Sequence, residues 1–95
     1  MSVVIVGGHD SMHKEYVKVC KKHNCKAKVF TQMETDFRSK IGNPDFMIFL
    51  TDVVSHKLII SAKKEAAKKK IAIIRNHNST VNAVENIILE LSKAN

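Results

Sequence analysis

Apolar and polar positions change their period along the chain, and the changes predict strands and helices in alternation. Continuous or alternating apolar runs, which are typical of strands, occupy residues 2–8, 26–32, 46–54 and 71–75. Apolar positions spaced by three or four residues, which are typical of helices buried along one face, occupy residues 12–24, 55–70 and 79–95, with a short helix expected at 35–41. Strands that alternate with helices form a parallel sheet covered on both faces. We therefore expect one small three-layer α/β domain over residues 1–95, Rossmann-like or flavodoxin-like, with a four-stranded parallel sheet.

The composition of each run predicts its place in that domain. The run "FMIFLTDVV" at 46–54 is the most apolar and predicts a central strand, whereas "KAKVFTQ" at 26–32 alternates and predicts an edge strand. Helix boundaries are expected where capping residues stand: Asp10 or Ser11 before the first helix, Asn24 after it, and Ser55 before the third. The inner faces of the helices are expected to be Met12, Tyr16, Val17 and Cys20, then Leu58, Ala62 and Ala66, then Val81, Val84, Ile88 and Leu91.

Charge and cysteine content narrow the classes of function. The net charge is +7 and the pI about 9.6, but the lysines gather in the later turns of predicted helices, and aromatic residues do not interleave them. We expect solvated basic helix faces and no specific nucleic-acid partner. Apolar runs shorter than the roughly 20 residues that span a bilayer argue against a membrane protein. Cys20 and Cys25 match no metal or disulfide motif, so we expect two reduced thiols in a cytoplasmic protein.

The histidines gather at one predicted edge of the sheet. His9 follows the first strand, His13 opens the first helix, His56 opens the helix after the third strand, and His77 follows the fourth strand. Ligands of open parallel sheets bind outside the carboxyl ends of the strands. We expect these four histidines to line a shared site. Asp52 stands on the same edge and is expected to cap the helix that follows it.

Motifs of known chemistry are incomplete in this chain. The stretch "VVIVGGHD" resembles the opening of a dinucleotide-binding unit, but the third glycine of G-x-G-x-x-G is missing. Asp52 stands where a receiver domain has its phosphoacceptor, without the acidic pair or the lysine strand that such a domain needs. Nucleophile and paired-carboxylate sets are incomplete as well. We therefore expect a protein that is not an enzyme, and we keep phosphate or nucleotide binding by Gly7, Gly8 and the helix N-termini as the alternative function.

Three segments together resemble a known family. They are "VGGHDSMHKEY", "FTQMETDFRSKIGNPDFMIFLTDVVSHK" and "IRNHNST", and they cover nearly the whole chain. The family is a group of small bacterial and cyanobacterial domains of unknown function, also called the domain related to iron. The resemblance implies a small α/β domain linked to iron and redox regulation, for which haem binding through histidine has been proposed. The resemblance also implies that His13, His56 and His77 are candidate iron ligands.

The residues permit haem as the cofactor. Two imidazoles, or one imidazole and a methionine, on opposite faces of a haem give a six-coordinate iron suited to electron transfer or sensing. Met12 and Met33 are expected to cover the haem, and Arg38, Lys57 and Arg75 to meet its propionates. Zinc or non-haem iron is the alternative metal. One edge of so small a domain does not supply enough surface to bury a haem, so we also expect a homodimer, formed through the last helix or the site edge. We further expect a protein partner in iron or redox regulation.

Overall fold

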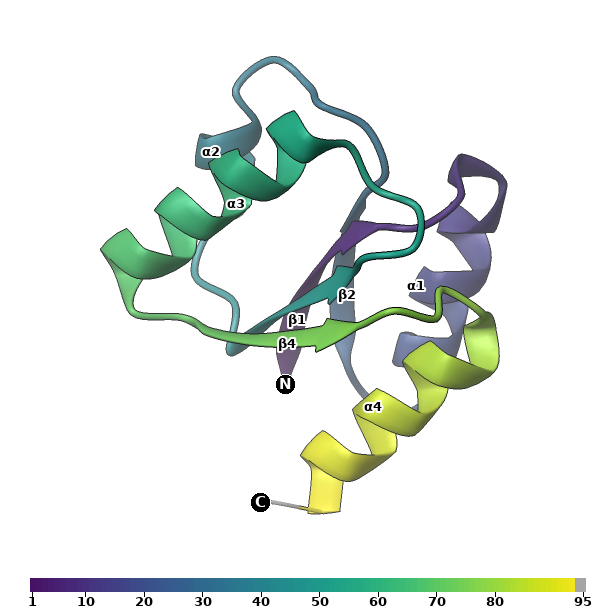
Figure 1. The fold of residues 1–95 in the computed structure, drawn as a ribbon. Helices are drawn as coiled ribbons and strands as arrows, with labels where there is room; N and C mark the ends of the chain where they lie inside the picture. Colours follow the sequence, from purple (N-terminus) through teal and green to yellow (C-terminus); the bar gives the residue numbers. More distant parts are fainter. Residues whose placement is uncertain (94–95) are drawn as a thin grey trace.

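The computed structural model describes residues 1–93 of the 95-residue chain (Figure 1). Strands and helices alternate as the sequence predicts. The strands are β1 (Ser2–Gly7), β2 (Lys26–Phe30), β3 (Phe46–Leu50) and β4 (Ala72–Asn76). The helices are the 3-10 turn η1 (Asp10–Met12), then α1 (His13–Lys22), α2 (Phe37–Lys40), α3 (His56–Lys69) and α4 (Val81–Lys93). Residues 94 and 95, included in the predicted last helix, lie outside the described part.

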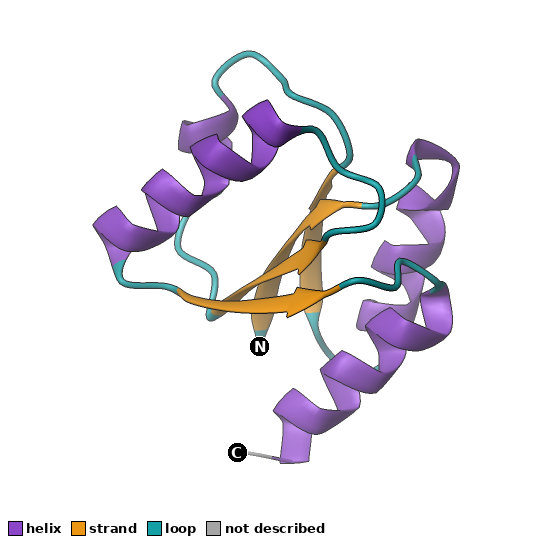
Figure 2. Cartoon of the chain, in the orientation of Figure 1, coloured by secondary structure: helices purple, strands orange, loops and turns teal. Residues whose placement is uncertain are grey.

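All four strands are parallel and stand in the order β2-β1-β3-β4. Helices α1 and α4 cover one face of the sheet, and α2 and α3 cover the other (Figures 1 and 2). This confirms the predicted three-layer α/β domain, with β3 inside the sheet and β2 at its edge. The order is that of the flavodoxin-type sheet up to its fourth strand, and it places the topological switch point between β1 and β3.

The two central strands supply side chains to two separate cores, because successive residues of a strand point to opposite faces. Val3 and Ile5 of β1 pack with α1 and α4, whereas Val4 and Val6 pack with α2 and α3. Such strands are buried on both faces, and this explains why β1 and β3 appear in the sequence as continuous apolar runs. The predicted inner residues of the helices lie in these cores; Tyr16, Cys20, Leu58, Ala62, Val84 and Ile88 are fully buried.

Helix boundaries confirm two predicted caps and correct one. The Ser55 hydroxyl accepts a hydrogen bond from the Leu58 N–H at 3.1 Å and begins α3. Asn24 adopts the left-handed conformation (φ 58°) and ends the turn after α1. The expectation that Asp10 or Ser11 caps α1 is wrong, because both belong to η1 and Met12 stands at the N-cap position. The Asp10 carboxylate instead accepts a hydrogen bond from the Thr31 hydroxyl at 2.8 Å.

One buried carboxylate was not expected from the sequence. Glu65 is 5% exposed on the inner side of α3, where Lys69 Nζ and Arg38 Nε each approach its oxygens to 3.0 Å. Lys69 also donates to the Gly42 carbonyl at 2.6 Å. Glu65 thus joins α3 to α2 and to the turn before β3. The hydrogen bond from Lys69, assisted by that from Arg38, lowers the pKa of Glu65 below its ordinary value of 4.5.

Among the helices of residues 1–93, none combines the length and the apolar composition that a bilayer-spanning segment requires.

The ion pairs of Glu65 should make the free energy of unfolding depend on pH in the acidic range. Its folded-state pKa is lowered, so its stabilising contribution is complete above its unfolded pKa and is lost as the pH falls through the folded value. We expect Glu65→Gln to lower the free energy of unfolding near pH 6 and to flatten its decline between about pH 6 and about pH 3. Urea unfolding at several pH values measures both effects. Glu15→Gln, at an exposed position on α1, is the control and should leave both unchanged. A Glu65→Gln profile parallel to that of the wild type would contradict this assignment.

Candidate functional site

The carboxyl edge of the sheet carries the histidines that the sequence analysis placed there. His9 follows β1, His13 begins α1, His56 begins α3, and His77 follows β4. All four side chains are exposed. His23 lies at the other end of α1, where its Nε2 is 2.7 Å from the Glu85 carboxylate of α4. The edge is therefore rich in imidazole, and what it can bind depends on how the loops between the histidines are built.

The crevice between β1 and β3 is closed by backbone. The Gly8 N–H donates to the Val53 carbonyl at 2.7 Å, so the loop after β1 is joined to the loop after β3. Gly7 and Gly8 have positive φ values of 106° and 86°. A Cβ on Gly7 would stand 2.5 Å from the Leu50 carbonyl oxygen, which only glycine avoids. These glycines bring protein segments together, and the N–H of Gly8 is already used, so the geometry does not favour a phosphate at this turn.

A buried tyrosine fastens the same edge from the α1 side. The Tyr16 side chain is fully buried, and its hydroxyl donates to the Ser79 carbonyl at 2.6 Å. A Cβ on Gly8 would meet this hydroxyl at 2.6 Å, so the ring occupies the space that a side chain at position 8 would need. Burial raises the pKa of the Tyr16 phenol, against the lowering effect of its hydrogen bonds with the backbone of His9 and with Ser79. The phenol is therefore a neutral hydrogen-bond donor at physiological pH.

Asp52 completes this network. One oxygen of its carboxylate accepts from the Ser79 hydroxyl at 2.9 Å and from the Ser79 N–H at 3.2 Å. The expectation that Asp52 caps the helix following it is therefore wrong: Ser55 caps α3, and Asp52 holds the loop that leads into α4. Tyr16, Asp52 and Ser79 come from three different loops or helices, and together they fix the relative positions of three strand ends.

The predicted iron ligands do not gather at one point. Within residues 1–93, no three side chains among histidine, cysteine, aspartate and glutamate lie close enough together to hold a metal ion. His77 has the Thr51 hydroxyl 3.5 Å from its Nδ1. Among the described residues, the chain therefore lacks the tetrahedral set that zinc requires, and His13, His56 and His77 do not form a three-histidine site.

The predicted ligand His56 lines a groove. This groove, of about 530 Å³, lies between α3 and the segment leading into α2, and its lining residues are Met33, Arg38, His56, Lys57, Ile60, Ser61 and Lys64. Four of them, Met33, Arg38, His56 and Lys57, were predicted as cofactor contacts or ligands. The groove combines an imidazole and a thioether with three cationic side chains and an isoleucine that is 40% exposed. Such a lining suits a ligand that has an apolar core and anionic groups at its periphery.

Two other predicted contacts lie elsewhere. Met12 is half-buried and packs against the core between the sheet and the α1–α4 layer. Arg75 projects over the Phe49 ring, with its guanidinium carbon 5.9 Å from the ring centroid. The structure therefore brings Met33, Arg38, His56 and Lys57 together. It leaves Met12, Arg75 and the two glycines in structural contacts.

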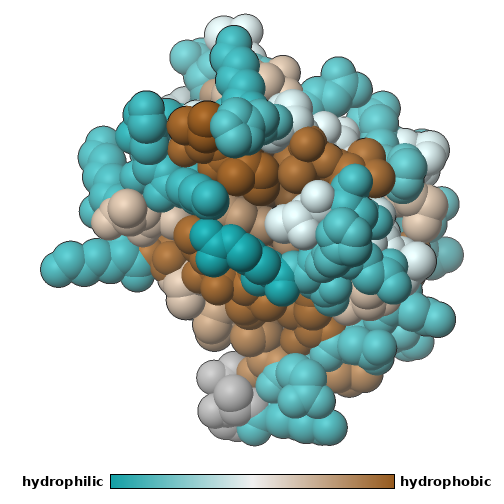
Figure 3. Space-filling model, in the orientation of Figure 1, coloured by the Kyte–Doolittle hydropathy of each residue, from teal (hydrophilic) through white to brown (hydrophobic). Residues whose placement is uncertain are grey.

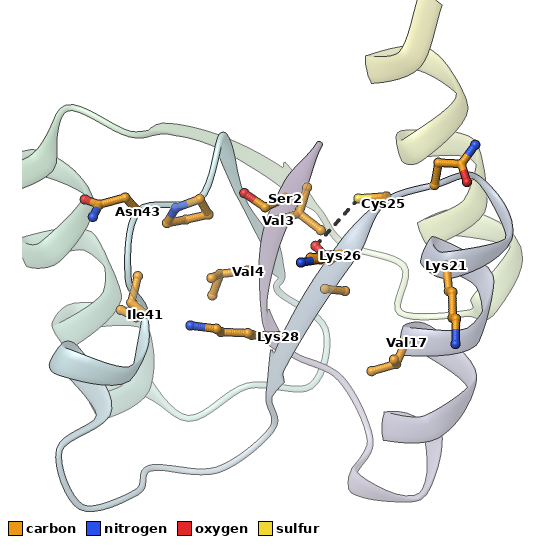
Figure 4. A pocket seen from close by; sticks show the side chains of 13 residues that line it. Ser2, Val3, Val4, Val17, Lys21, Cys25, Lys26, Lys28, Ile41 and Asn43 are labelled. Carbon is orange, nitrogen blue, oxygen red and sulfur yellow. Dashed lines mark hydrogen bonds between the residues drawn. The ribbon is translucent and has the colours of Figure 1, made fainter.

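A further hollow, of about 690 Å³, lies at the opposite end of the sheet (Figure 4). It is lined by the amino ends of β1 and β2, by Val17 and Lys21 of α1 and by the turn before β3, and its described lining includes no histidine. The Cys25 sulfur there points toward the Lys26 carbonyl at 3.8 Å (Figure 4). Both cysteines are free and buried, and burial raises the pKa of the Cys20 thiol to about 12. A thiol so rarely ionised does not serve as a nucleophile.

The fold and the edge define a small Rossmann-like α/β domain that presents a basic, histidine-bearing groove. The chain belongs to the bacterial family described as "Uncharacterized protein conserved in bacteria (DUF2325)", which matches residues 2–91. Its fold is similar to that of a de novo designed Rossmann fold protein, with a TM-score of 0.65, 19% identity and 96% of each chain covered. None of the curated proteins compared with it matches. The designed protein shows the fold alone, so function has to be argued from the site.

Removing the Tyr16 hydroxyl should weaken this edge. Tyr16→Phe leaves the Ser79 carbonyl without its buried donor, and we expect it to cost about 1–3 kcal/mol of unfolding free energy. Urea denaturation followed by circular dichroism measures the loss. Thr31→Val removes an exposed hydroxyl bond, that to Asp10, and serves as the control with an expected change below about 0.5 kcal/mol. Equal stabilities of Tyr16→Phe and the wild type would show that the network carries little of the fold's stability.

Proposed function

We propose that this domain binds haem as a non-enzymatic regulatory or redox-sensing protein, and that His56 would hold the haem iron. The observation that carries the proposal is the groove beside α3, which sets the His56 imidazole and the Met33 thioether among Arg38, Lys57 and Lys64. The proposal agrees with the resemblance to the domain related to iron.

Each part of the groove has a role that its chemistry supports. Imidazole and thioether are common axial ligands of haem iron. Arg38 uses its Nε–H on Glu65, which fixes the guanidinium and leaves its terminal N–H donors for a propionate. Ile60 offers apolar surface to the porphyrin face. Bound haem would supply an iron centre whose valence or ligation reports redox state, while the protein supplies binding and orientation.

A second side chain could hold the haem iron together with His56. Met33 lines the same groove as His56 and is the intramolecular candidate. His13 and His77, which the structure leaves exposed and apart from this groove, remain candidates that a second chain could contribute. The phosphate or nucleotide alternative has weaker support, because the Gly8 N–H that would cradle a phosphate is bonded to Val53.

A haem titration followed in the visible range tests the ligand. We expect wild-type protein to develop a sharp low-spin Soret band at one haem per groove. Since iron loses its anchoring ligand, His56→Ala should abolish the band or weaken haem binding by more than the roughly 10–100-fold caused by losing an outer-shell partner. His9→Ala removes an equally exposed histidine of the same edge that does not line the groove, and it should bind like the wild type. Wild-type protein that gives no specific band would overturn the proposal.

Variants of two adjacent lysines of α3 distinguish haem binding in the groove from general attraction of haem to the positive charge of the chain. Lys64 lines the groove, and the exposed Lys63 does not. We expect Lys64→Glu to weaken haem binding because it sets a carboxylate against the propionates, and Lys63→Glu to leave it nearly unchanged. Equal losses in the two variants would mean that haem follows the net positive charge of the chain, not this groove.

A further inference from the structure

The two edges of the sheet differ in how they are protected. β2 carries Lys26 and Lys28 on its exposed positions, and Lys28 Nζ donates to the Lys40 carbonyl at 3.0 Å. Lysines on an edge strand are a common defence against pairing with another chain. β4 has the sequence AIIRN, and its single charged residue, Arg75, lies over the Phe49 ring. The β4 edge is therefore the unprotected one.

The backbone of β4 has groups directed away from the sheet. The Asn76 carbonyl accepts from the Thr51 N–H at 2.9 Å, on the β3 side. In a parallel ladder the N–H and C=O of alternate residues face the same neighbour, so those of Ala72 and Ile74 also face β3. The N–H and C=O groups of Ile73 and Arg75 then face outward, where β4 has no strand neighbour among residues 1–93. In a flavodoxin-type sheet a fifth strand occupies this position.

A groove runs beside this edge on the α4 side. It measures about 500 Å³ and is lined by Ile74, Asn76, Asn78, Thr80, Asn82, Ala83, Asn86, Ile87, Glu90 and Leu91. Apolar surface extends across the middle of the molecule in the view that faces β4 (Figure 3). The edge and the groove together form one continuous surface of unpaired backbone, isoleucine and asparagine, which we call the β4–α4 face.

Charge indicates what can cover this face. The chain has 16 cations and a net charge of +7, yet residues 71–92 contain one cation, Arg75, and two carboxylates, Glu85 and Glu90. A symmetric contact sets a surface against its own copy, so like charges on that surface repel. A second copy can therefore approach the β4–α4 face of this basic molecule without bringing lysines of the two copies against each other. An acidic partner would instead be drawn to the lysine-bearing helices.

We propose that the β4–α4 face binds a second copy of this chain, with the two β4 strands paired antiparallel about a two-fold axis. The pairing joins two four-stranded sheets into one and sets α4 beside α4 of the other copy on the same side. Outward N–H and C=O groups of Ile73 and Arg75 form the new ladder, and the uncharged groove residues pack across the axis. This face shares no residue with the His56 groove, so the proposal stands apart from haem binding.

A pair of substitutions at one residue tests the ladder. Arg75→Pro removes an outward N–H, and Arg75→Ala removes the side chain while keeping that N–H. Sedimentation equilibrium at micromolar concentration should show wild-type and Arg75→Ala protein at twice the 10.7 kDa chain mass, and Arg75→Pro shifted to the monomer. Circular dichroism confirms that each variant is folded.

A second pair tests the groove if Arg75→Pro fails to fold. Asn86→Lys places a new charge against its symmetry copy and should weaken the dimer by at least about tenfold. Ala67→Lys adds the same charge at an exposed position of α3 and should not change it. The proposal is wrong if the wild-type protein is a monomer, even if the β4 edge of that monomer binds a peptide or another protein. A dimer that persists in folded Arg75→Pro or in Asn86→Lys also overturns it, because the contact then lies elsewhere.

Discussion

The hydrogen bond from the Tyr16 hydroxyl to the Ser79 carbonyl is the constraint on which the carboxyl edge of this molecule depends. It connects α1 to the loop after β4, and Asp52 connects that loop to the end of β3. The Gly8–Val53 backbone bond adds the end of β1. Since the ring of Tyr16 occupies the space beside Gly8, a side chain at position 8 and a tyrosine at position 16 are mutually exclusive in this packing.

Because protein fills the switch point, the grooves of this edge lie at its two flanks. In many open α/β sheets the crevice between diverging strands receives the ligand. Here backbone and the tyrosine ring close it, and the hollows of the carboxyl half lie beside α3 on one face and beside α4 on the other. The α3 groove is cationic and the α4 groove is mostly uncharged, so the two flanks suit different classes of ligand. Their separation lets a small domain present two independent surfaces.

Local patterns predicted the elements well because each depends on neighbours in sequence. Val84 and Ile88 are buried at helical spacing, and Ser55 caps the helix that it precedes. Contacts between distant segments were harder to foresee. Asp52 meets a partner 27 residues away, and its position before a helix suggested a different role. Glu65, with Lys69 one turn on, has the pattern of a solvated helix face, yet it is buried and pairs with Arg38 of α2 as well as with Lys69.

The candidate site was predicted in part for the same reason. Placing four histidines at one edge needed only the strand order, whereas their separation depends on loop conformations that the sequence does not encode in any short pattern. Met33, Arg38 and His56 share a groove because α2 packs on α3. The sequence Gly7-Gly8 after a strand is the same whether the Gly8 N–H binds a phosphate or, as here, the Val53 carbonyl. The difference is fixed by the tertiary structure.

The 63-residue separation between Tyr16 and Ser79 has a consequence for how the chain is made. A ribosome releases the central strand β1 before its neighbour β3 and well before the Ser79 loop. Until residue 79 has left the exit tunnel, the tyrosine hydroxyl lacks its acceptor and the inner face of α1 lacks α4. The nascent domain therefore carries exposed apolar strands until these segments emerge, and the carboxyl edge is assembled only after the Ser79 loop is available.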